Sequence, residues 1–206
     1  MKKYRMILAS GSPRRKEILS LAGIEFDVRK TETEEKTTKK IPAEIVCELS
    51  RKKACEAASK VLAEDTKEEF LLILGADTMV SLGKGAKAEI LGKPADEKAA
   101  CAMIRKFQGR THYVYTGVTV LVYQKKENKF EPVNTICFAE ETEVRVCQMT
   151  EEEIWDYVSR GESLDKAGAY GIQGSFAPYI RGIQGDYYNV VGLPLSRLYQ
   201  EIKEYI

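Results

Sequence analysis

Hydrophobic and polar positions follow two different periods along the first half of the chain. Short apolar runs bounded by polar residues predict strands, and apolar residues spaced three and four apart predict helices. The predicted strands are 4–9, 25–29 and 70–74, and the predicted helices are 13–22 and 43–63. The segment 70–74 is apolar throughout, which is typical of a strand buried on both faces. Strands that alternate with helices indicate an α/β fold.

The second half of the chain combines a helix, two long strands and a glycine-rich segment. We expect a polar hairpin at 81–87, a helix at 96–107, strands at 114–122 and 135–146 joined by a turn at 124–129, and helices at 155–159 and 196–205. Thr150 and Glu153 have the spacing of a capping box before the helix at 155–159. Residues 165–195 are rich in glycine and aromatic side chains and are assigned to no helix or strand.

The composition excludes several classes of protein. A chain of 206 residues is long enough for one domain over 1–206, with a core that needs no disulfides. Lys and Arg number 32 against 31 Asp and Glu, so the net charge of +1 attracts neither nucleic acid nor an anionic membrane. No apolar run approaches 18 residues and no secretory leader is visible, so we expect a cytoplasmic protein without a membrane partner or stable nucleic-acid binding.

Cysteine and histidine usage argues against zinc. The five cysteines stand at positions 47, 55, 101, 137 and 147, without a Cys-x-x-Cys pair, so we expect reduced thiols that serve packing. The single histidine is His112, and with scattered cysteines it cannot form an ordinary His/Cys zinc site. We therefore expect His112 to be structural, and no histidine-based triad.

The helix at 13–22 begins with an unusual concentration of positive charge. Ser12 is a good N-cap, Pro13 suits the first helical position, and Arg14 and Arg15 follow in the first turn. Helix N-termini carry unpaired N–H groups and a partial positive charge, so cations there are unfavourable unless an anion joins them. Phosphate is an anion that such a site binds. The alternative is that both guanidinium groups extend into water and that the motif is only a cap.

Two lysines are candidates for binding the same anion. Lys53 falls in the middle of the apolar stripe of the helix at 43–63, with Lys52 at its edge. An inward lysine either extends along a shallow groove to water or meets an anion in a cleft, and the sequence leaves both alternatives open. Lys93 lies in a Gly-Lys-Pro sequence, which predicts a tight loop that presents one ammonium group.

Carboxylates occur in two different settings. Asp77 follows the buried apolar run in Gly75-Ala76-Asp77-Thr78, so we expect it at the tip of a central strand. Glu32, Glu34 and Glu35 lie in a polar loop, where each is expected to be solvated. If one of them approaches Asp77, the pair supplies hard oxygen ligands suited to Mg²⁺ or Mn²⁺.

Familiar nucleotide-binding loops are absent or mismatched. The sequence Gly-x-x-x-x-Gly-Lys-Ser/Thr does not occur, so a P-loop is excluded. The glycines of 83–88 imitate a dinucleotide fingerprint, but no helix of useful length follows, so we interpret this segment as a hairpin. The glycines of 168–174 either let the backbone approach a ligand, with Gln173 reading a base edge, or form only the turns of a connection.

Several motifs, taken in order, resemble those of one family over essentially the whole chain. They are Leu8 to Arg15 (LASGSPRR), Gly75 to Thr78 (GADT), Gly92 to Pro94 (GKP), Asp165 to Gly174 (DKAGAYGIQG) and Val191 to Pro194 (VGLP). This pattern is similar to that of the Maf-type nucleoside triphosphate pyrophosphatases. The resemblance implies an α/β fold with a mixed twisted sheet flanked by helices, and two lobes around a central nucleotide cleft, as in Maf and ITPase proteins.

The resemblance also implies an activity, a metal and a set of site residues. The family hydrolyses nucleoside triphosphates to the monophosphate and pyrophosphate with a divalent cation (Mg²⁺ or Mn²⁺), in a house-cleaning role with a link to septum formation. It implies Asp77 as the catalytic residue and Asp77 with Glu34 as metal ligands, although Glu32 and Glu35 are close enough to Glu34 to replace it in an alignment made by eye. The implied substrate-binding residues are Ser10, Arg14, Arg15, Lys53, Thr78, Lys93 and Gln173.

Two roles for Asp77 compete. It either accepts the proton of the water that attacks the α-phosphorus or mainly holds the metal, because a carboxylate bound to metal is a weak base.

Three other positions carry the implied substrate preference. Arg14, Thr78 and Gln173 match the branch that cleaves dTTP and UTP, whereas tryptophan, glutamine and glutamate there would imply 7-methyl-GTP. The hairpin around 84–88 is longer than is usual for the family, which affects the rim of the cleft.

Two further points stay open at the level of sequence. A nucleotide-sensing module would bind a triphosphate at the same cationic helix start without cleaving it, and dependence of turnover on a metal would distinguish an enzyme from such a sensor. Tyr187 and Tyr188 fit either a homodimer interface or the core.

Overall fold

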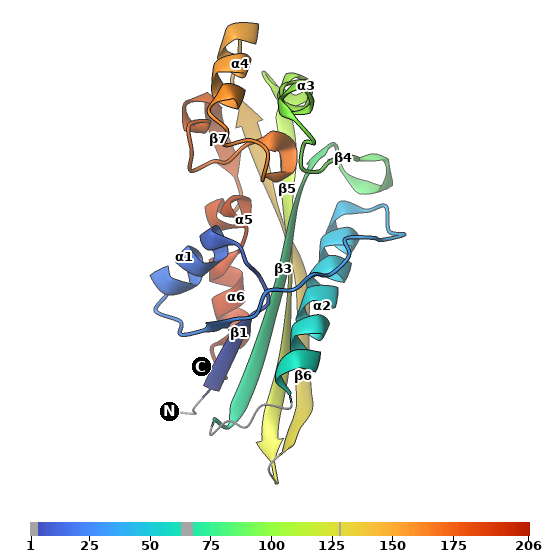
Figure 1. The fold of residues 1–206 in the computed structure, drawn as a ribbon, viewed down its shortest axis with the longest axis vertical. Helices are drawn as coiled ribbons and strands as arrows, with labels where there is room; N and C mark the ends of the chain where they lie inside the picture. Colours follow the sequence, from blue (N-terminus) through green and yellow to red (C-terminus); the bar gives the residue numbers. More distant parts are fainter. Residues whose placement is uncertain (1–3, 63–67, 128) are drawn as a thin grey trace.

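The computed structural model describes residues 4–62, 68–127 and 129–206, which form a mixed sheet flanked by helices (Figure 1). The strands are β1 (Tyr4–Leu8), β2 (Asp27–Val28), β3 (Phe70–Leu82), β4 (Glu89–Leu91), β5 (Thr111–Lys126), β6 (Lys129–Val146) and β7 (Ile180–Gln184). The helices are α1 (Pro13–Leu21), α2 (Pro42–Val61), α3 (Glu97–Phe107), α4 (Glu151–Ser159), α5 (Tyr187–Val191) and α6 (Leu195–Ile202). The predicted α/β class is therefore confirmed.

The sheet has the strand order β2-β1-β3-β5-β6-β7, and β4 also pairs with β3. β1 runs parallel to β2 and β3, whereas every other pairing is antiparallel. Helix α2 covers one face, and α1, α5 and α6 cover the opposite face (Figure 1). Helices α3 and α4 lie with β7 at the end of the sheet remote from the chain termini.

One edge of β3 is interrupted near its middle. β1 pairs with residues 70–74 of β3, and β4 pairs with residues 80–82 on the same edge. Residues 75–79 therefore pair with a strand on one edge only, and that strand is β5. Successive side chains of a strand point to opposite faces, so Asp77 and Thr78 extend to different faces of the sheet beside this interruption.

The expectation that Asp77 lies at a strand tip is wrong. β3 continues to Leu82 because β5 pairs with it from Phe70 to Ser81, and Asp77 lies opposite Gly117 in that ladder. The glycine and aspartate after the apolar run resemble a strand end when read locally. The pairing that extends β3 involves residues some forty positions away, so it leaves no mark in the local pattern.

Three other expectations about the strands and loops also need correction. β5 and β6 are paired as far as Lys126 and Lys129, so the connection is much shorter than the predicted turn at 124–129. β6 includes Pro132 at a register shift near Val122 and begins at Lys129, six residues before the predicted start at 135. Residues 165–195 contain β7 and α5, since β7 finds its partner at the end of β6.

The predicted helices agree with the structure apart from their ends. The helix at 43–63 is α2, and residue 63 lies outside the described residues; the last helix ends at Ile202 rather than at 205. The capping box of Thr150 and Glu153 is confirmed at α4. Ser12 occupies the N-cap position of α1, but its side chain forms no capping hydrogen bond.

Two main cores lie on either side of the interruption in β3. The first packs α1 and α6 on one face of the sheet, and the second packs α3 and α4 around Phe107, Tyr157 and Phe176. His112 is buried in the second core, where its Nε2 lies 2.7 Å from the hydroxyl of Tyr170. Burial lowers the pKa of His112 to about 3, so the side chain is neutral and structural, as expected.

Several expectations about the surface can be compared with the structure. No helix of the described residues is both long and apolar enough to cross a membrane. All five cysteines are free thiols, although Cys55 and Cys137 are exposed, so packing does not account for those two. Tyr188 packs against the first core, whereas Tyr187 is exposed. A homodimer stays a prediction.

Candidate active site

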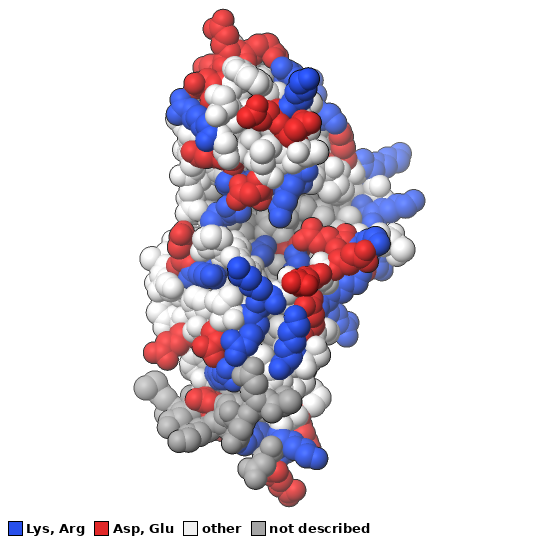
Figure 2. Space-filling model, in the orientation of Figure 1, with Lys and Arg blue, Asp and Glu red and all other residues white. Residues whose placement is uncertain are grey.

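A pocket of about 530 Å³ lies at the interruption in β3. It is lined by the start of α1, by one side of α2, by β3, by the loop before α3 and by the glycine-rich segment after α4. Its charged side chains are basic Arg14, Arg15, Lys53, Lys93 and Lys166, and acidic Glu35, Asp77 and Asp165. The excess of basic groups makes the pocket suitable for an anion, although acidic and basic side chains are mixed over the surrounding surface (Figure 2).

Asp77, Lys53 and Glu35 form an ion-pair cluster at one side of the pocket. The ammonium Nζ of Lys53 lies 2.5 Å from Oδ1 of Asp77 and 2.9 Å from Oε1 of Glu35. The Lys53 side chain is only 14% exposed. Of the two alternatives for this lysine, the structure therefore favours contact with negative groups in a cleft over extension into water.

The two carboxylates of this cluster differ in their affinity for protons. Burial raises the pKa of Asp77 above its ordinary value, and the positive charge of Lys53 only partly opposes this effect. Burial is the largest single effect on Glu35 and acts to raise its pKa, but the hydrogen bond from Lys53 and the nearby positive charges together outweigh burial, so the pKa of Glu35 is lowered. Burial thus makes Asp77 more basic than an ordinary aspartate, which is the property that a proton acceptor needs.

Arg15 connects three segments on the other face of the sheet. Its guanidinium donates hydrogen bonds to the Gly192 carbonyl at 2.9 Å, to the Ser10 hydroxyl at 3.1 Å and to the Thr78 hydroxyl at 3.1 Å. The Thr78 hydroxyl also lies 2.9 Å from that of Thr116. Burial lowers the pKa of Arg15, with nearby Asp77 opposing the effect. Arg15 therefore holds the helix start, β3 and the segment before α6 in one arrangement.

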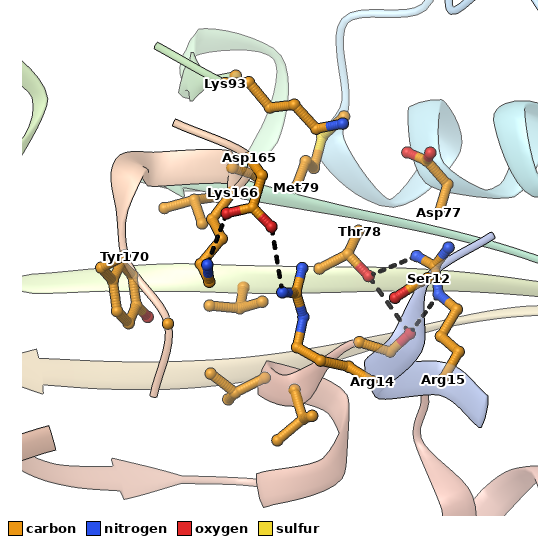
Figure 3. Close-up of a pocket in the computed structure, with 18 of the residues that line it drawn as sticks. Ser12, Arg14, Arg15, Asp77, Thr78, Met79, Lys93, Asp165, Lys166 and Tyr170 are labelled. Carbon is orange, nitrogen blue, oxygen red and sulfur yellow. Dashed lines mark hydrogen bonds and ion pairs between the residues drawn. The ribbon is translucent and has the colours of Figure 1, made fainter. Parts of the chain in front are cut away.

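Arg14 belongs to a separate charged group at the rim. Its Nη1 lies 3.5 Å from Oδ2 of Asp165, and the other oxygen of Asp165 accepts a hydrogen bond of 2.6 Å from Lys166 (Figure 3). Lys93 and Gln173 also line the pocket, and within the described residues neither side chain forms a hydrogen bond or ion pair. Both side chains are thus available to a ligand.

The structure brings most of the predicted site residues together. Those that line the pocket are Arg14, Arg15, Lys53, Asp77, Thr78, Lys93 and Gln173. Ser10 is buried beside the pocket, where it accepts hydrogen bonds from Arg15 and from the Ser12 amide. Asp165 and Lys166 also line the pocket; they stand inside one of the recognised motifs, but sequence reasoning gave them no role.

The predicted metal ligand Glu34 is not in the pocket. Its carboxylate is 72% exposed and pairs with Lys36 at 2.5 Å, and Glu32 is also exposed. Glu35 is the loop carboxylate that lines the pocket, and it shares the Lys53 ammonium with Asp77. Side chains that are adjacent in a loop extend in different directions. The sequence alone therefore does not show which of Glu32, Glu34 and Glu35 extends toward Asp77.

The donor atoms of the pocket fit a divalent cation only in part. No group of three or more His, Cys, Asp and Glu side chains suited to a metal occurs among residues 4–62, 68–127 and 129–206. Asp77 and Glu35 nevertheless converge on one cation, the Lys53 ammonium. Mg²⁺ typically takes one or two carboxylates and completes its shell with substrate phosphates and water. Two convergent carboxylates are compatible with such a site.

Comparisons with known proteins agree with the motifs. The family model described as "Maf-like protein" matches residues 5–205. A dTTP/UTP pyrophosphatase of Agathobacter rectalis is 48% identical over 206 residues, covering 97% of each chain. One of Lachnoclostridium phytofermentans is 46% identical over 202 residues, covering 98% of this chain and 95% of the other. One of Bacillus cereus strain AH820 is 45% identical with the same coverage.

A likeness to a solved structure is much weaker. A HAM1 protein from Coxiella burnetii superposes with a TM-score of 0.36 and 12% identity, covering 71% of this chain and 74% of that chain. A TM-score this low supports no statement about function.

Proposed function

Because the chain belongs to the Maf-like protein family, we propose that it hydrolyses nucleoside triphosphates, preferentially dTTP and UTP, to the monophosphate and pyrophosphate. Relatives named dTTP/UTP pyrophosphatase match it over nearly their full length. The observation that carries the proposal is a buried carboxylate with a raised pKa, Asp77, in a pocket whose charged side chains are mainly basic. The house-cleaning role and the link to septum formation stay predictions.

Asp77 is the proposed acceptor of the proton from the attacking water. The water adds to the α-phosphorus while the bond from that phosphorus to the bridging oxygen breaks, and pyrophosphate leaves with the bonding electrons. Burial supports this role because it makes Asp77 more basic than an exposed aspartate, while the adjacent Lys53 ammonium favours the ionised form that accepts a proton.

The basic residues of the pocket would stabilise the phosphate charges. Arg14, Lys53 and Lys93 reach the pocket from α1, from α2 and from the loop before α3, so they can contact a triphosphate along its length. Charge on the pyrophosphate leaving group increases during the reaction, and fixed cations there lower the barrier. Arg15 already donates three hydrogen bonds within the protein, which supports a role in holding the site together in addition to contact with phosphate.

A divalent cation, Mg²⁺ or Mn²⁺, is the proposed cofactor, held by Asp77 and Glu35. Glu35 takes the place predicted for Glu34, because it shares the Lys53 ammonium with Asp77. The cation would neutralise phosphate oxygens and orient the water. With such a cation in place, Lys53 would contact the carboxylates less, and its ammonium would be available to a phosphate oxygen.

Selection of the base is assigned to Arg14, Thr78 and Gln173, the three positions that match the dTTP/UTP branch. Gln173 lines the pocket, and its amide has no partner among the described residues, so it is available to donate to and accept from a pyrimidine edge. The Thr78 hydroxyl is committed to Arg15 and Thr116, which supports an indirect contribution through the shape of the pocket.

A panel of triphosphates tests the proposed activity. dTTP, UTP, CTP, dATP, GTP and 7-methyl-GTP are incubated with Mg²⁺ or Mn²⁺, and the product nucleotide and pyrophosphate are identified. We expect monophosphate and pyrophosphate chiefly from dTTP and UTP, and no turnover with EDTA. Turnover of 7-methyl-GTP alone would overturn the base preference. Binding of a triphosphate in EDTA without cleavage under any condition would instead support a nucleotide sensor.

A further inference from the structure

Residues 162–166 link α4 to the pocket, where they contact Arg14 and the loop backbone on both sides of Gln173. The segment begins after Gly161, whose φ of 77° lets the chain turn at the end of α4. It then follows the rim of the pocket, where Asp165 and Lys166 are part of the lining. None of its side chains has a role in the hydrolysis proposed above.

Glu162 holds the loop that carries Gln173. Its Oε2 accepts a hydrogen bond of 3.0 Å from the amide of Ser175. The same carboxylate packs against Gly174, where a Cβ atom would lie 2.1 Å from Oε2, so only glycine allows this approach. The loop is closed on itself by a hydrogen bond of 3.1 Å from the Gly174 amide to the Gly171 carbonyl. Gln173 lies inside this closed turn.

Lys166 supports the other end of the same loop. Its Nζ donates to the Glu162 carbonyl and to Oδ1 of Asp165, both at 2.6 Å, and the side chain is only 16% exposed. Its Cε would lie 2.8 Å from a Cβ atom at Gly171, so the lysine stem lies directly on the backbone of the loop. The ammonium is satisfied within the segment, which is typical of a structural lysine rather than of a free phosphate ligand.

Asp165 joins this arrangement to Arg14. One oxygen binds Lys166 and the other lies 3.5 Å from the Arg14 guanidinium, so the aspartate bridges the two cations (Figure 3). A guanidinium paired with a carboxylate has fewer accessible rotamers than a solvated one. Arg14 and Gln173 therefore depend on one short segment for their placement, although they are far apart in the sequence.

We propose that Glu162, Asp165 and Lys166 are positioning residues for base selection, which hold Gln173 and Arg14 at a fixed separation across the pocket. This inference rests on the proposed function, because it concerns how the same pocket distinguishes one pyrimidine from another. UTP and CTP share sugar and triphosphate and differ at the base, so the ratio of their kcat/KM values isolates the effect.

The variants Glu162→Ala and Asp165→Asn test the proposal. Glu162→Ala removes the contact to the Ser175 amide, and Asp165→Asn removes the negative charge that pairs with Lys166 and Arg14. For each variant we expect the UTP-to-CTP ratio of kcat/KM to fall about tenfold. Glu162→Gln keeps an acceptor for the Ser175 amide and should restore part of the ratio. Glu152→Gln is the matched control, since it removes an exposed carboxylate from the start of α4.

Hydrogen exchange provides a readout that does not depend on turnover. We expect Glu162→Ala to speed amide exchange within residues 171–176 while exchange in β3 and β5 stays as in the wild type. A folded Glu162→Ala protein with the wild-type ratio, or with wild-type exchange in 171–176, would overturn the proposal. Absence of hydrolysis by the wild-type protein would instead count against the proposed function, and the exchange measurement would still decide whether Glu162 holds the loop.

Discussion

Asp77 and Glu35 contact the same ammonium group, yet their pKa values move in opposite directions. Asp77 is buried, so the cost of removing its charge from water dominates, whereas Glu35 is more exposed, and the hydrogen bond from Lys53 together with the nearby positive charges outweighs the effect of burial. Two carboxylates in different environments can divide two tasks between them. Asp77, whose pKa is raised, suits proton transfer, and Glu35, whose pKa is lowered, suits a ligand that stays ionised.

The pH dependence of turnover should reveal the influence of Lys53 on Asp77. Asp77 must be ionised to accept a proton, so kcat/KM should rise with pH through the pKa of Asp77. Lys53 favours the ionised form, and Lys53→Met should therefore move this acid limb upward by about one pH unit or more, besides slowing turnover. The measurement is the pH profile of kcat/KM for UTP.

Lys52→Met is the matched control for that experiment. Lys52 precedes Lys53 in α2 but binds Glu48 and the Lys36 carbonyl outside the pocket. Its profile should follow the wild type. An unshifted acid limb in Lys53→Met would contradict the assignment of that limb to Asp77.

At the scale of elements, the contact between α2 and the sheet determines where Lys53 lies. A Cβ atom at Gly117 of β5 would lie 2.2 Å from the Val46 carbonyl, and one at Gly75 of β3 would lie 2.2 Å from the Ser50 carbonyl. The helix thus rests directly on the backbone of two strands. Gly117 is also the cross-strand neighbour of Asp77, so the close packing and the ion pair share one place in the fold.

Gly117→Ala should force α2 away from the sheet. We expect the free energy of unfolding to fall by about 1–3 kcal/mol, which is typical of overpacking in a core, and turnover to fall as Lys53 is displaced. Denaturant unfolding measures the first effect. Gly182→Ala in β7 is the control, because a Cβ atom there meets nothing within 4 Å; it should leave stability within about 1 kcal/mol of the wild type. Equal stability of the two variants would contradict the packing argument.

The second core should lose stability in acid through His112. Its pKa is about 3 in the folded protein and about 6.5 when unfolded, so the unfolded state binds the extra proton between these values. The contribution of the neutral side chain is complete above pH 6.5 and is lost as the pH falls toward 3. At pH 5 the loss is about 2 kcal/mol relative to neutral pH.

His112→Gln removes this titration. The free energy of unfolding of both proteins is measured at pH 7.5 and pH 5.0. We expect the wild type to lose about 2 kcal/mol more than the variant over this interval. Equal losses would mean that His112 is not held in its neutral form.

The sequence predicted elements better than it predicted their edges and contacts. The capping box of Thr150 and Glu153 and the inward position of Lys53 follow from local spacing, and both agree with the structure. The continuation of β3 beyond Asp77 depends on pairing with β5, which local spacing does not encode. The choice of Glu35 over Glu34 depends on the path of a loop, where no periodicity fixes the direction of a side chain.

At the scale of the whole molecule, the site lies where β3 has no paired strand on one of its edges. β1 leaves β3 after Leu74 and β4 joins it at Val80, so the strand between them faces a space instead of a partner. The pocket can therefore extend around the sheet edge to both faces, with Asp77 on the α2 side and Thr78 on the side of Arg15. The order of the motifs along the sequence identified residues of this pocket. None of the motifs predicted that the pocket lies at an edge of the sheet.

The turnover of Asp77→Asn tests the central claim most directly. The variant keeps the size of the side chain and a hydrogen-bond acceptor for Lys53, but it cannot accept the proton from water or supply an ionised ligand. With UTP and a divalent cation we predict a loss in kcat of at least about a hundredfold, in a protein whose circular dichroism and unfolding remain those of a folded chain. A folded Asp77→Asn protein that releases pyrophosphate at the wild-type rate would contradict the account.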